Sequence, residues 1–127
     1  MIRNTKLFYL TLSFVFYWGV VCAPAHASEI EDWKPLNGTS IKKALENQKV
    51  QYPNEGGARQ EFHTNGSTVY IENGPSFGSW RTSDSQYCSV WPPASSWVCY
   101  QVFISLDQRR IRFIGDSGRI YEGVFVP

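Results

Sequence analysis

The sequence predicts a small all-β domain with one short N-terminal helix, in which an antiparallel meander closes into a barrel. Three observations lead to this prediction. From position 51 onward, turn-forming residues recur roughly every eight to twelve residues, and the segments between them alternate in polarity with no helical pattern between them. Aromatic residues make up 16% of the 127-residue chain. They favour a β-rich core because their side chains pack well on pleated, half-buried surfaces.

Residues 1–27 have the pattern of a cleavable secretory signal peptide. Arg3 and Lys6 precede an uncharged run over residues 7–21, and Ala25-His26-Ala27 supplies small residues at the cleavage positions. The run is shorter than the roughly 18 to 20 residues that a membrane span needs. We therefore expect cleavage after Ala27, a periplasmic or secreted location, and no stable membrane insertion of the remaining chain.

Cys22 offers an alternative end to this segment, as a site of lipid attachment. Such a site has a large aliphatic residue three positions before the cysteine and a small residue directly before it. Gly19 and Val21 occupy these positions in the reverse sense, so the sequence favours cleavage over lipidation.

Cleavage after Ala27 leaves residues 28–127, the size of one small domain. It removes two of the 12 basic residues and none of the 11 acidic ones, so the net charge falls to near −1. This balance argues against nucleic acid or an anionic membrane surface as the main partner.

The first part of this domain contains the one predicted helix. Residues 28–37 are polar and include Pro35, so we expect an extended lead-in that Trp33 and Leu36 pin to the domain. Residues 41–48 then show helical spacing, and Thr39 or Ser40 can cap the first turn. The apolar face of this helix consists of Ile41, Ala44 and Leu45. A helix this short is stable only when it packs on a sheet.

Alternating segments and turns follow. Asn65-Gly66 is the strongest two-residue hairpin signal in the chain and separates a strand at 60–64 from one at 67–72. Asn37-Gly38-Thr39 and Asn65-Gly66-Ser67 also match a glycosylation sequence, but we interpret them as a helix cap and a hairpin turn. The remaining predicted strands cover residues 77–82, 86–91, 96–106, 109–114 and 119–126.

The longest of these strands indicates which side faces the core. Its more uniformly apolar face consists of Val98, Tyr100, Val102, Ile104 and Leu106. On the next strand we expect Ile111 and Phe113 in the core, with Arg110 and Arg112 in water. The facing of residues 120–125 is ambiguous, and Gly123 is expected at a bulge or bend where the sheet curls.

Cys88 and Cys99 lie on consecutive predicted strands, and in an exported chain they are expected to form one disulfide. The closed loop of about eleven residues corresponds to a stabilisation of roughly 2.5 to 3 kcal/mol. A redox-active pair would have CxxC spacing at a helix start, which is absent. Two thiols and the distant His63 do not form a closed zinc site, so we expect neither metal nor cofactor.

The sequence contains no catalytic motif that we can identify. His63 is the one histidine after cleavage, and the pattern favours a surface position beside a turn over a general base. Acidic residues are scattered singly, and Gly115-Asp116-Ser117-Gly118 is a turn instead of a phosphate-binding loop. We therefore expect a protein that is not an enzyme.

A cluster of aromatic residues surrounds the two cysteines and is the candidate ligand-binding site. With one nearby cation, its members are Trp80, Arg81, Tyr87, Trp91, Trp97 and Tyr100. Three interpretations remain open: core packing over the disulfide, an apolar pocket in a barrel mouth, or exposed rings that stack on sugars or anchor a protein partner. Trp91 precedes two prolines at a loop tip, so we expect its indole to be accessible to solvent.

One stretch of the chain resembles a group of small exported proteobacterial proteins of unknown function. The resemblance includes a short helix after a Leu-x-Gly-Thr lead, a Gly-x-Trp strand and two cysteines in a hairpin. The residues that carry it are Leu36-Asn37-Gly38-Thr39, Gly78-Ser79-Trp80, Tyr87-Cys88-Ser89-Val90-Trp91 and Cys99-Tyr100. The resemblance implies a lipocalin-like (calycin-like) barrel and supplies no catalytic residues.

Three hypotheses about function follow. The first is an exported binding protein for a small apolar ligand or a cell-envelope component, which a cavity of a few hundred Å³ would favour (roughly 300 to 1,000 Å³ is typical). The second is a secreted interaction factor or enzyme inhibitor that acts through aromatic loop residues, which a filled barrel with a flat patch would favour. The third is a hydrolase built on His63, which requires a cleft and a carboxylate within hydrogen-bond reach.

Overall fold

The computed structural model describes residues 19–20 and 32–127. The predicted cleavage site after Ala27 and the alternative lipid site Cys22 lie outside the described residues. So does all of the predicted signal peptide except Gly19 and Val20.

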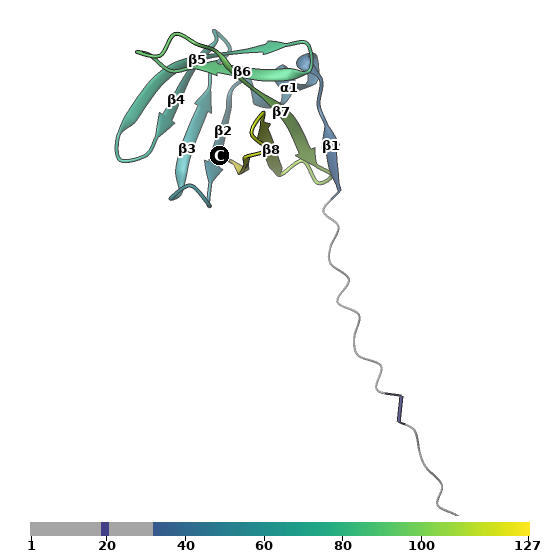
Figure 1. Cartoon of the computed structure of the whole chain (residues 1–127). Coiled ribbons are helices and arrows are strands. Elements are labelled where there is room, and N and C mark those ends of the chain that lie inside the picture. The colour runs from purple at the N-terminus through teal and green to yellow at the C-terminus, as the bar shows by residue number, and fades with distance from the viewer. Residues whose placement is uncertain (1–18, 21–31) are drawn as a thin grey trace, which may run out of the picture.

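Residues 32–127 contain one helix and nine strands (Figure 1). The helix is α1 (Gly38–Leu45), and the strands are β1 (Trp33–Pro35), β2 (Gln48–Tyr52), β3 (Ala58–Phe62), β4 (Ser67–Ile71), β5 (Pro75–Ser83), β6 (Gln86–Val90), β7 (Val98–Ser105), β8 (Arg110–Gly115) and β9 (Ile120–Val126). Strands β2 to β9 pair antiparallel in chain order, and β9 pairs back onto β2. The prediction of an all-β domain whose meander closes into a barrel is therefore confirmed.

Strand β1 pairs with the same edge of β7 as β6 does, further along the strand. β6 pairs with the first half of β7, and β1 pairs with the second half, where Trp33 is opposite Ser105. The backbone N–H of Leu36 donates to the carbonyl of Val102 at 2.9 Å. Of the extended lead-in predicted over residues 28–37, the described part from residue 32 onward, held by Trp33 and Leu36, is confirmed.

The helix begins and ends three residues earlier than the sequence predicts, and its cap is Asn37, not Thr39 or Ser40. The Asn37 side chain accepts from the backbone N–H of Ser40 at 3.0 Å, and the Ser40 hydroxyl accepts from the backbone N–H of Asn37 at 2.8 Å. This reciprocal capping box satisfies two backbone donors at once, which moves the helix start forward. At the other end Gln48 already belongs to β2.

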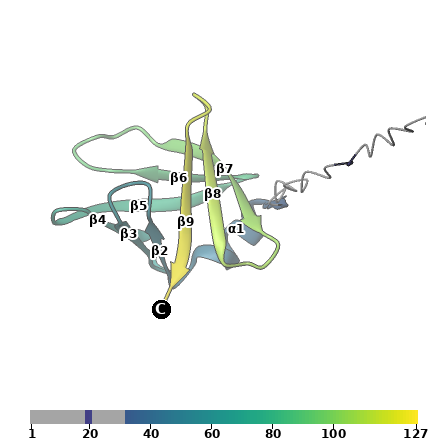
Figure 2. The same cartoon turned by 90° about the horizontal axis from the view of Figure 1, so that it is seen from below.

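Helix α1 closes one end of the barrel. Ile41 and Leu45 are fully buried, and the N–H of Gly38 donates to the carbonyl of Asp84 in the β5–β6 turn at 2.6 Å. The turns β3–β4, β5–β6 and β7–β8 lie at this end because the strands alternate in direction. Figure 2 shows the β4–β5 hairpin and the β6–β7 connection projecting on the side away from α1. The expectation that the helix packs on the sheet is confirmed.

One strand was not predicted from the sequence, and one turn was predicted with the wrong length. Residues 48–52 form strand β2, although the polar sequence of that segment carries little strand signal. The β3–β4 turn is a three-residue loop, in which the N–H of His63 donates to the carbonyl of Ser67 at 2.9 Å and Gly66 has a φ of 88°. A glycine in the left-handed region at the third position is typical of this longer hairpin.

The prediction of which β7 residues face the core is confirmed at the centre of the strand and wrong at its ends. Val102 is buried, but Val98 is 51% exposed and Leu106 is 66% exposed. Val98 is the first residue of β7 and Leu106 follows its last residue, so both exposed side chains are at strand ends. Ile111 and Phe113 are buried, as predicted.

The expectation that Arg112 projects into water was wrong. Its guanidinium lies 4.1 Å from the centre of the Trp33 ring, and its Nε donates to the Glu122 carboxylate at 2.8 Å. The Arg110 guanidinium lies 5.3 Å from the same ring. β1 brings Trp33 onto this outer face, so both arginines stack on an indole there.

Gly123 marks a close approach of strands and not a bulge. Its pairing with Ile111 continues an unbroken register, and a Cβ at this position would lie 2.1 Å from the buried side chain of Val50. Tyr121 and Phe125 pack against the core, so the inward face of β9 contains Tyr121, Gly123 and Phe125.

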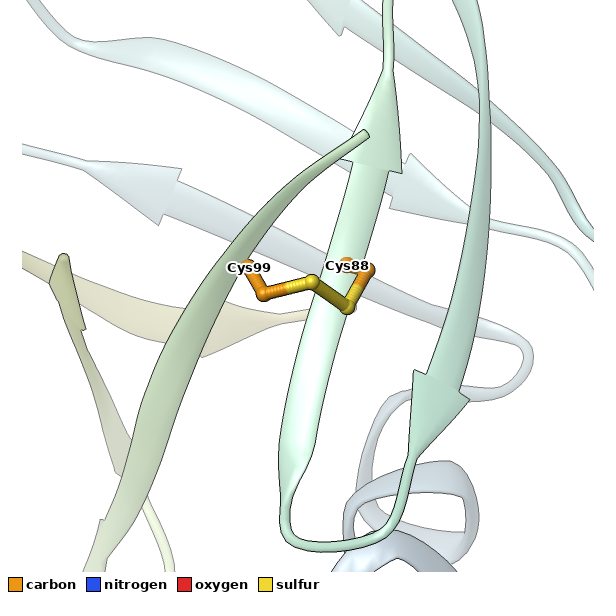
Figure 3. Close-up of a disulfide and its surroundings, with 2 residues drawn as sticks. All are labelled: Cys88 and Cys99. Carbon is orange, nitrogen blue, oxygen red and sulfur yellow. A yellow bond between two sulfur atoms is a disulfide. The ribbon is translucent and has the colours of Figure 1, made fainter. Parts of the chain in front are cut away.

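The predicted disulfide is confirmed. Cys88 on β6 lies directly opposite Cys99 on β7, and their sulfur atoms are bonded (Figure 3). The inward residues of β6 are Tyr87 and Ser89, so Cys88 projects from the outer face of the barrel, as does Cys99.

Candidate binding pocket

A pocket of about 470 Å³ lies in the barrel at the end opposite α1. The turns β2–β3, β4–β5, β6–β7 and β8–β9 surround this end, and its lining comes from β2 to β9. The lining residues are Tyr52, Glu55, Gln60, Tyr70, Ser76, Phe77, Tyr87, Ser89, Trp91, Pro92, Tyr100, Phe113, Arg119 and Tyr121. Phe77, which is 68% exposed, lies at the rim, so the pocket opens to solvent there.

A buried hydrogen-bond network centred on Gln60 forms part of the lining. The Tyr52 hydroxyl donates to the amide oxygen of Gln60 at 2.8 Å. The Gln60 amide nitrogen donates to the Thr68 hydroxyl and to the Tyr87 hydroxyl, each at 3.0 Å. Both amide hydrogens and the amide oxygen are thus paired, which offsets the cost of burying this side chain.

Two ring pairs form further parts of the wall. Tyr70 on β4 and Trp91 after β6 meet edge to face, with ring centres 6.2 Å apart. Tyr100 on β7 and Tyr121 on β9 meet in the same manner at 6.0 Å. The Trp91 indole also donates to the Ser89 hydroxyl at 3.2 Å. The wall is therefore aromatic, with hydroxyl groups placed along it.

The two charged residues of the pocket lining have opposite charges and pair with each other. An Arg119 guanidinium nitrogen lies 3.4 Å from the Glu55 carboxylate, and the guanidinium lies 4.6 Å from the centre of the Tyr121 ring. The Arg119 side chain remains largely exposed to solvent. The pair adds no net charge to the pocket.

Burial raises the pKa of four of the phenols that line the pocket. Burial raises the pKa of Tyr87 to about 12, although hydrogen bonds to Ser89 and Gln60 oppose the change. Burial also raises the pKa of Tyr52 well above its usual range, and it is the main cause of the raised pKa values of Tyr70 and Tyr100. At neutral pH these side chains are uncharged and can donate hydrogen bonds.

The structure brings three of the six predicted site residues to the pocket. Tyr87, Trp91 and Tyr100 line it. Trp80 lies in the core outside the lining: it is buried, its indole N–H donates to the carbonyl of His63 at 3.0 Å, and it packs edge to face on Phe62.

The other predicted residues, Arg81 and Trp97, form a separate pair outside the pocket lining. The Arg81 guanidinium lies 4.0 Å from the centre of the Trp97 ring. Arg81 is also opposite Cys88 in the β5–β6 register, so this pair lies on the outer face of the barrel beside the disulfide.

Sequence reasoning missed five of the eight aromatic residues of the lining: Phe77 at the rim and four on the barrel wall. Tyr52, Tyr70, Phe113 and Tyr121 lie on β2, β4, β8 and β9, far along the chain from the cysteines. The signal that could have found them is their alternation: each is on the inward face of its strand, at the end away from the helix.

Trp91 keeps part of its surface exposed, but it is not a free loop tip. Its indole packs against Tyr70 and over Gly78, at which a Cβ would lie 2.6 Å from the indole carbon Cε3. Trp91 therefore belongs to the pocket wall.

His63 lies outside the pocket lining, with 44% of its side chain exposed. Its Nε2 is 3.8 Å from the Glu61 carboxylate, beyond hydrogen-bond distance. The geometric condition for the hydrolase hypothesis is therefore not met. Among the residues that the structure describes, no group of three or more His, Cys, Asp or Glu side chains could hold a metal ion, and no helix is long and apolar enough to cross a membrane.

A second hollow, of about 690 Å³, lies at the α1 end. Its lining includes the exposed side chains of Lys43, Leu106 and Gln108. Long exposed side chains move freely and define no fixed surface, whereas the mouth pocket has buried polar groups and packed rings. We therefore take the mouth pocket as the candidate site.

Comparison of the chain with protein-family models, curated proteins and solved structures found no match in any of the three. Inference about function therefore starts from the pocket.

Proposed function

We propose that this protein is an exported, non-catalytic binding protein that holds a small apolar ligand, or an apolar part of a cell-envelope component, in the mouth pocket. The observation that carries the proposal is a pocket of about 470 Å³ with a mainly aromatic wall. Pockets for small molecules typically measure about 300 to 1,000 Å³, with an apolar lining and a few placed polar groups. The helix at the far end of the barrel supports this function because it closes that end.

Export is part of the proposal. The signal-peptide pattern of residues 1–27 supports it, and the Cys88–Cys99 disulfide is compatible with an oxidising compartment such as the periplasm or the exterior.

The lipocalin-like character of the barrel is a finer proposal. A closed eight-stranded antiparallel meander with an N-terminal helix at one end supports it, as does the resemblance to small exported proteobacterial proteins. The Gly78-x-Trp80 motif lies on β5 and not on the first barrel strand, where lipocalins carry it. The proposal therefore concerns architecture and mode of binding, not common descent.

The alternative, an interaction factor or inhibitor that acts through loop aromatics, has one supporting observation. Phe77 is 68% exposed at the pocket rim, and the exposed Pro92 belongs to the same lining. It has less support than ligand binding because Trp91, its expected anchor, packs against Tyr70 in the pocket wall.

The test of ligand binding uses the uncharged apolar dye N-phenyl-1-naphthylamine, whose fluorescence rises in an apolar site. Ser76 lines the pocket on β5, and Ser79 is exposed on the same strand outside the lining. Ser76→Trp should fill the mouth and weaken dye binding about tenfold or more, whereas the matched control Ser79→Trp should bind as the native protein does. Equal affinities in the two variants, or no dye binding at all, would contradict the proposal.

Native mass spectrometry of the protein from its own cell envelope would then identify the ligand. A co-purifying small molecule that Ser76→Trp no longer retains supports the binding role. A co-purifying protein that Ser76→Trp retains, and that a Phe77→Ser variant loses, supports the interaction alternative.

A further inference from the structure

The hydroxyl groups of the pocket tyrosines fall into two sets. Those of Tyr52 and Tyr87 take part in the Gln60 network. For the hydroxyls of Tyr70, Tyr100 and Tyr121, which also line the pocket, no hydrogen bond occurs within the described part of the chain. Three donors are therefore left for water or for a ligand.

These three donors come from different sides of the pocket. Tyr70 is on β4, whereas Tyr100 and Tyr121 are on β7 and β9, nearly half of the barrel circumference away. Their rings and that of Trp91 provide apolar surface between the hydroxyls. A flat molecule that enters this space meets aromatic surface together with O–H donors on opposite sides.

The charges around the pocket favour an uncharged occupant. Arg119 and Glu55 pair with each other, which leaves no unopposed charge in the lining to compensate a charged ligand. A charged group in a partly buried aromatic site without a partner would lose the solvation energy that water gives it.

Given the proposed binding function, on which this step rests, we propose that the pocket selects an uncharged ring compound with an oxygen atom that accepts hydrogen bonds. The hydroxyls of Tyr70, Tyr100 and Tyr121 recognise this oxygen. An acceptor such as a ketone replaces water at these donors, while the ring covers the aromatic wall. The three tyrosines are then specificity-determining residues for acceptor-bearing ligands.

The test compares two dyes that differ in one group. 6-Propionyl-2-(dimethylamino)naphthalene carries a ketone, and its 6-propyl analogue has a methylene in place of the carbonyl. Because one hydrogen bond changes an equilibrium about three- to tenfold, the ketone should bind at least three times more tightly to the native protein. In the triple variant Tyr70→Phe, Tyr100→Phe, Tyr121→Phe, the affinity for the propyl dye should stay the same and the preference for the ketone should disappear.

The single Tyr→Phe variants show which hydroxyl is the main donor. They are also less prone to misfold than the triple variant, since each change removes one oxygen and keeps the ring. Circular dichroism checks that each variant folds. Equal affinities of the native protein for the two dyes would overturn the inference and leave the proposed function intact. Failure of both dyes to bind would overturn both.

The sulfonated dye 8-anilinonaphthalene-1-sulfonate tests the uncharged character of the ligand. It should bind more weakly than the ketone. Tighter binding of the sulfonate that Arg119→Gln removes would show that the pocket takes an anion at its rim, and would also overturn the inference.

Discussion

Gly78 leaves the space in which the indole of Trp91 lies. A Cβ at Gly78 would be 2.6 Å from the Trp91 indole and 2.6 Å from the carbonyl oxygen of Val90. Gly78→Ala should therefore displace the indole, or the strand beside it, and lower the free energy of unfolding by about 1 to 3 kcal/mol.

Urea unfolding followed by tryptophan fluorescence measures the effect of Gly78→Ala. The emission of the folded variant should shift to longer wavelength as Trp91 moves toward water. Ser79→Ala, one residue along and exposed, is the control and should change neither quantity. An unchanged midpoint for Gly78→Ala would mean that the indole relaxes without cost.

The buried phenol of Tyr87 predicts a loss of stability at high pH. Its pKa rises from 10.0 to about 12 on folding, so between these values the unfolded chain releases a proton that the folded chain keeps. The free energy of unfolding therefore falls as pH rises, by up to about 1.4 kcal/mol per pH unit from this one group. Stability from Tyr87 is fully present below pH 10 and is lost by about pH 12.

Urea unfolding at a series of pH values measures this slope, and Tyr52 should add to it because burial also raises its pKa. The matched variant Tyr87→Phe should show a smaller slope. A slope that Tyr87→Phe leaves unchanged would contradict the assignment.

At the residue scale, the sequence predicted the aromatic character of the site better than its members. Trp80 and Trp97 are near the cysteines in the chain, but neither lines the pocket: Trp80 packs in the core near the β3–β4 turn at the helix end, and Trp97 pairs with Arg81 on the outer face. Tyr52 and Tyr121 are distant in the chain and lie in the pocket because closure of the barrel brings β2 beside β9. Nearness in sequence is a poor guide when eight strands contribute to one site.

At the scale of elements, the disulfide ties β6 to β7 next to the pocket wall. Cys88 and Cys99 are 11 positions apart in the sequence. Closing a loop of this length lowers the entropy of the unfolded chain, which raises the free energy of unfolding by about 2.5 to 3 kcal/mol. The double variant Cys88→Ala, Cys99→Ala should lose up to that amount in urea unfolding. The native protein with reducing agent should lose a similar amount, and the reagent should leave the double variant unchanged.

A double variant as stable as the oxidised protein would contradict this role for the disulfide. The same experiment checks the pocket: both cysteines project from the outer face, so dye affinity should change far less than stability in the folded double variant.

The sequence predicted the strands and turns of residues 60–126 closely and failed around α1. The capping pair Asn37–Ser40 sets the start of the helix, but Thr39 and Ser40 are equally good cap residues when no structure is known. β2 was missed because Gln48, Lys49 and Gln51 mask its alternation. It forms because β3 and β9 pair with it on both sides. Pairing between distant strands, and not local propensity, decides this element.

For the molecule as a whole, closure was predictable and the cavity was not. The regular turns predicted a meander, and closure removes exposed strand edges that would otherwise promote aggregation. Whether the inward-facing aromatic rings fill the barrel depends on the orientation of each side chain. Trp91 leans over Gly78 and Tyr100 packs on Tyr121, and alternation along the strands does not encode these directions.

The proposed export would couple to folding of the molecule through its cysteines. With the leader removed, Cys88 and Cys99 are the two remaining thiols and can pair with each other, whereas an uncleaved chain keeps Cys22 as a third. We therefore expect the full sequence, expressed in a bacterium, to yield an envelope or secreted form that begins at Ser28 and lacks two hydrogens relative to the reduced chain. Intact-mass measurement with and without reductant tests both points at once.

Ala27→Leu, which places a large residue at the cleavage position, should block processing and retain the leader. A cytoplasmic protein with an intact leader and freely alkylated Cys88 and Cys99 would contradict export, and with it the compartment in which the proposed ligand is to be sought.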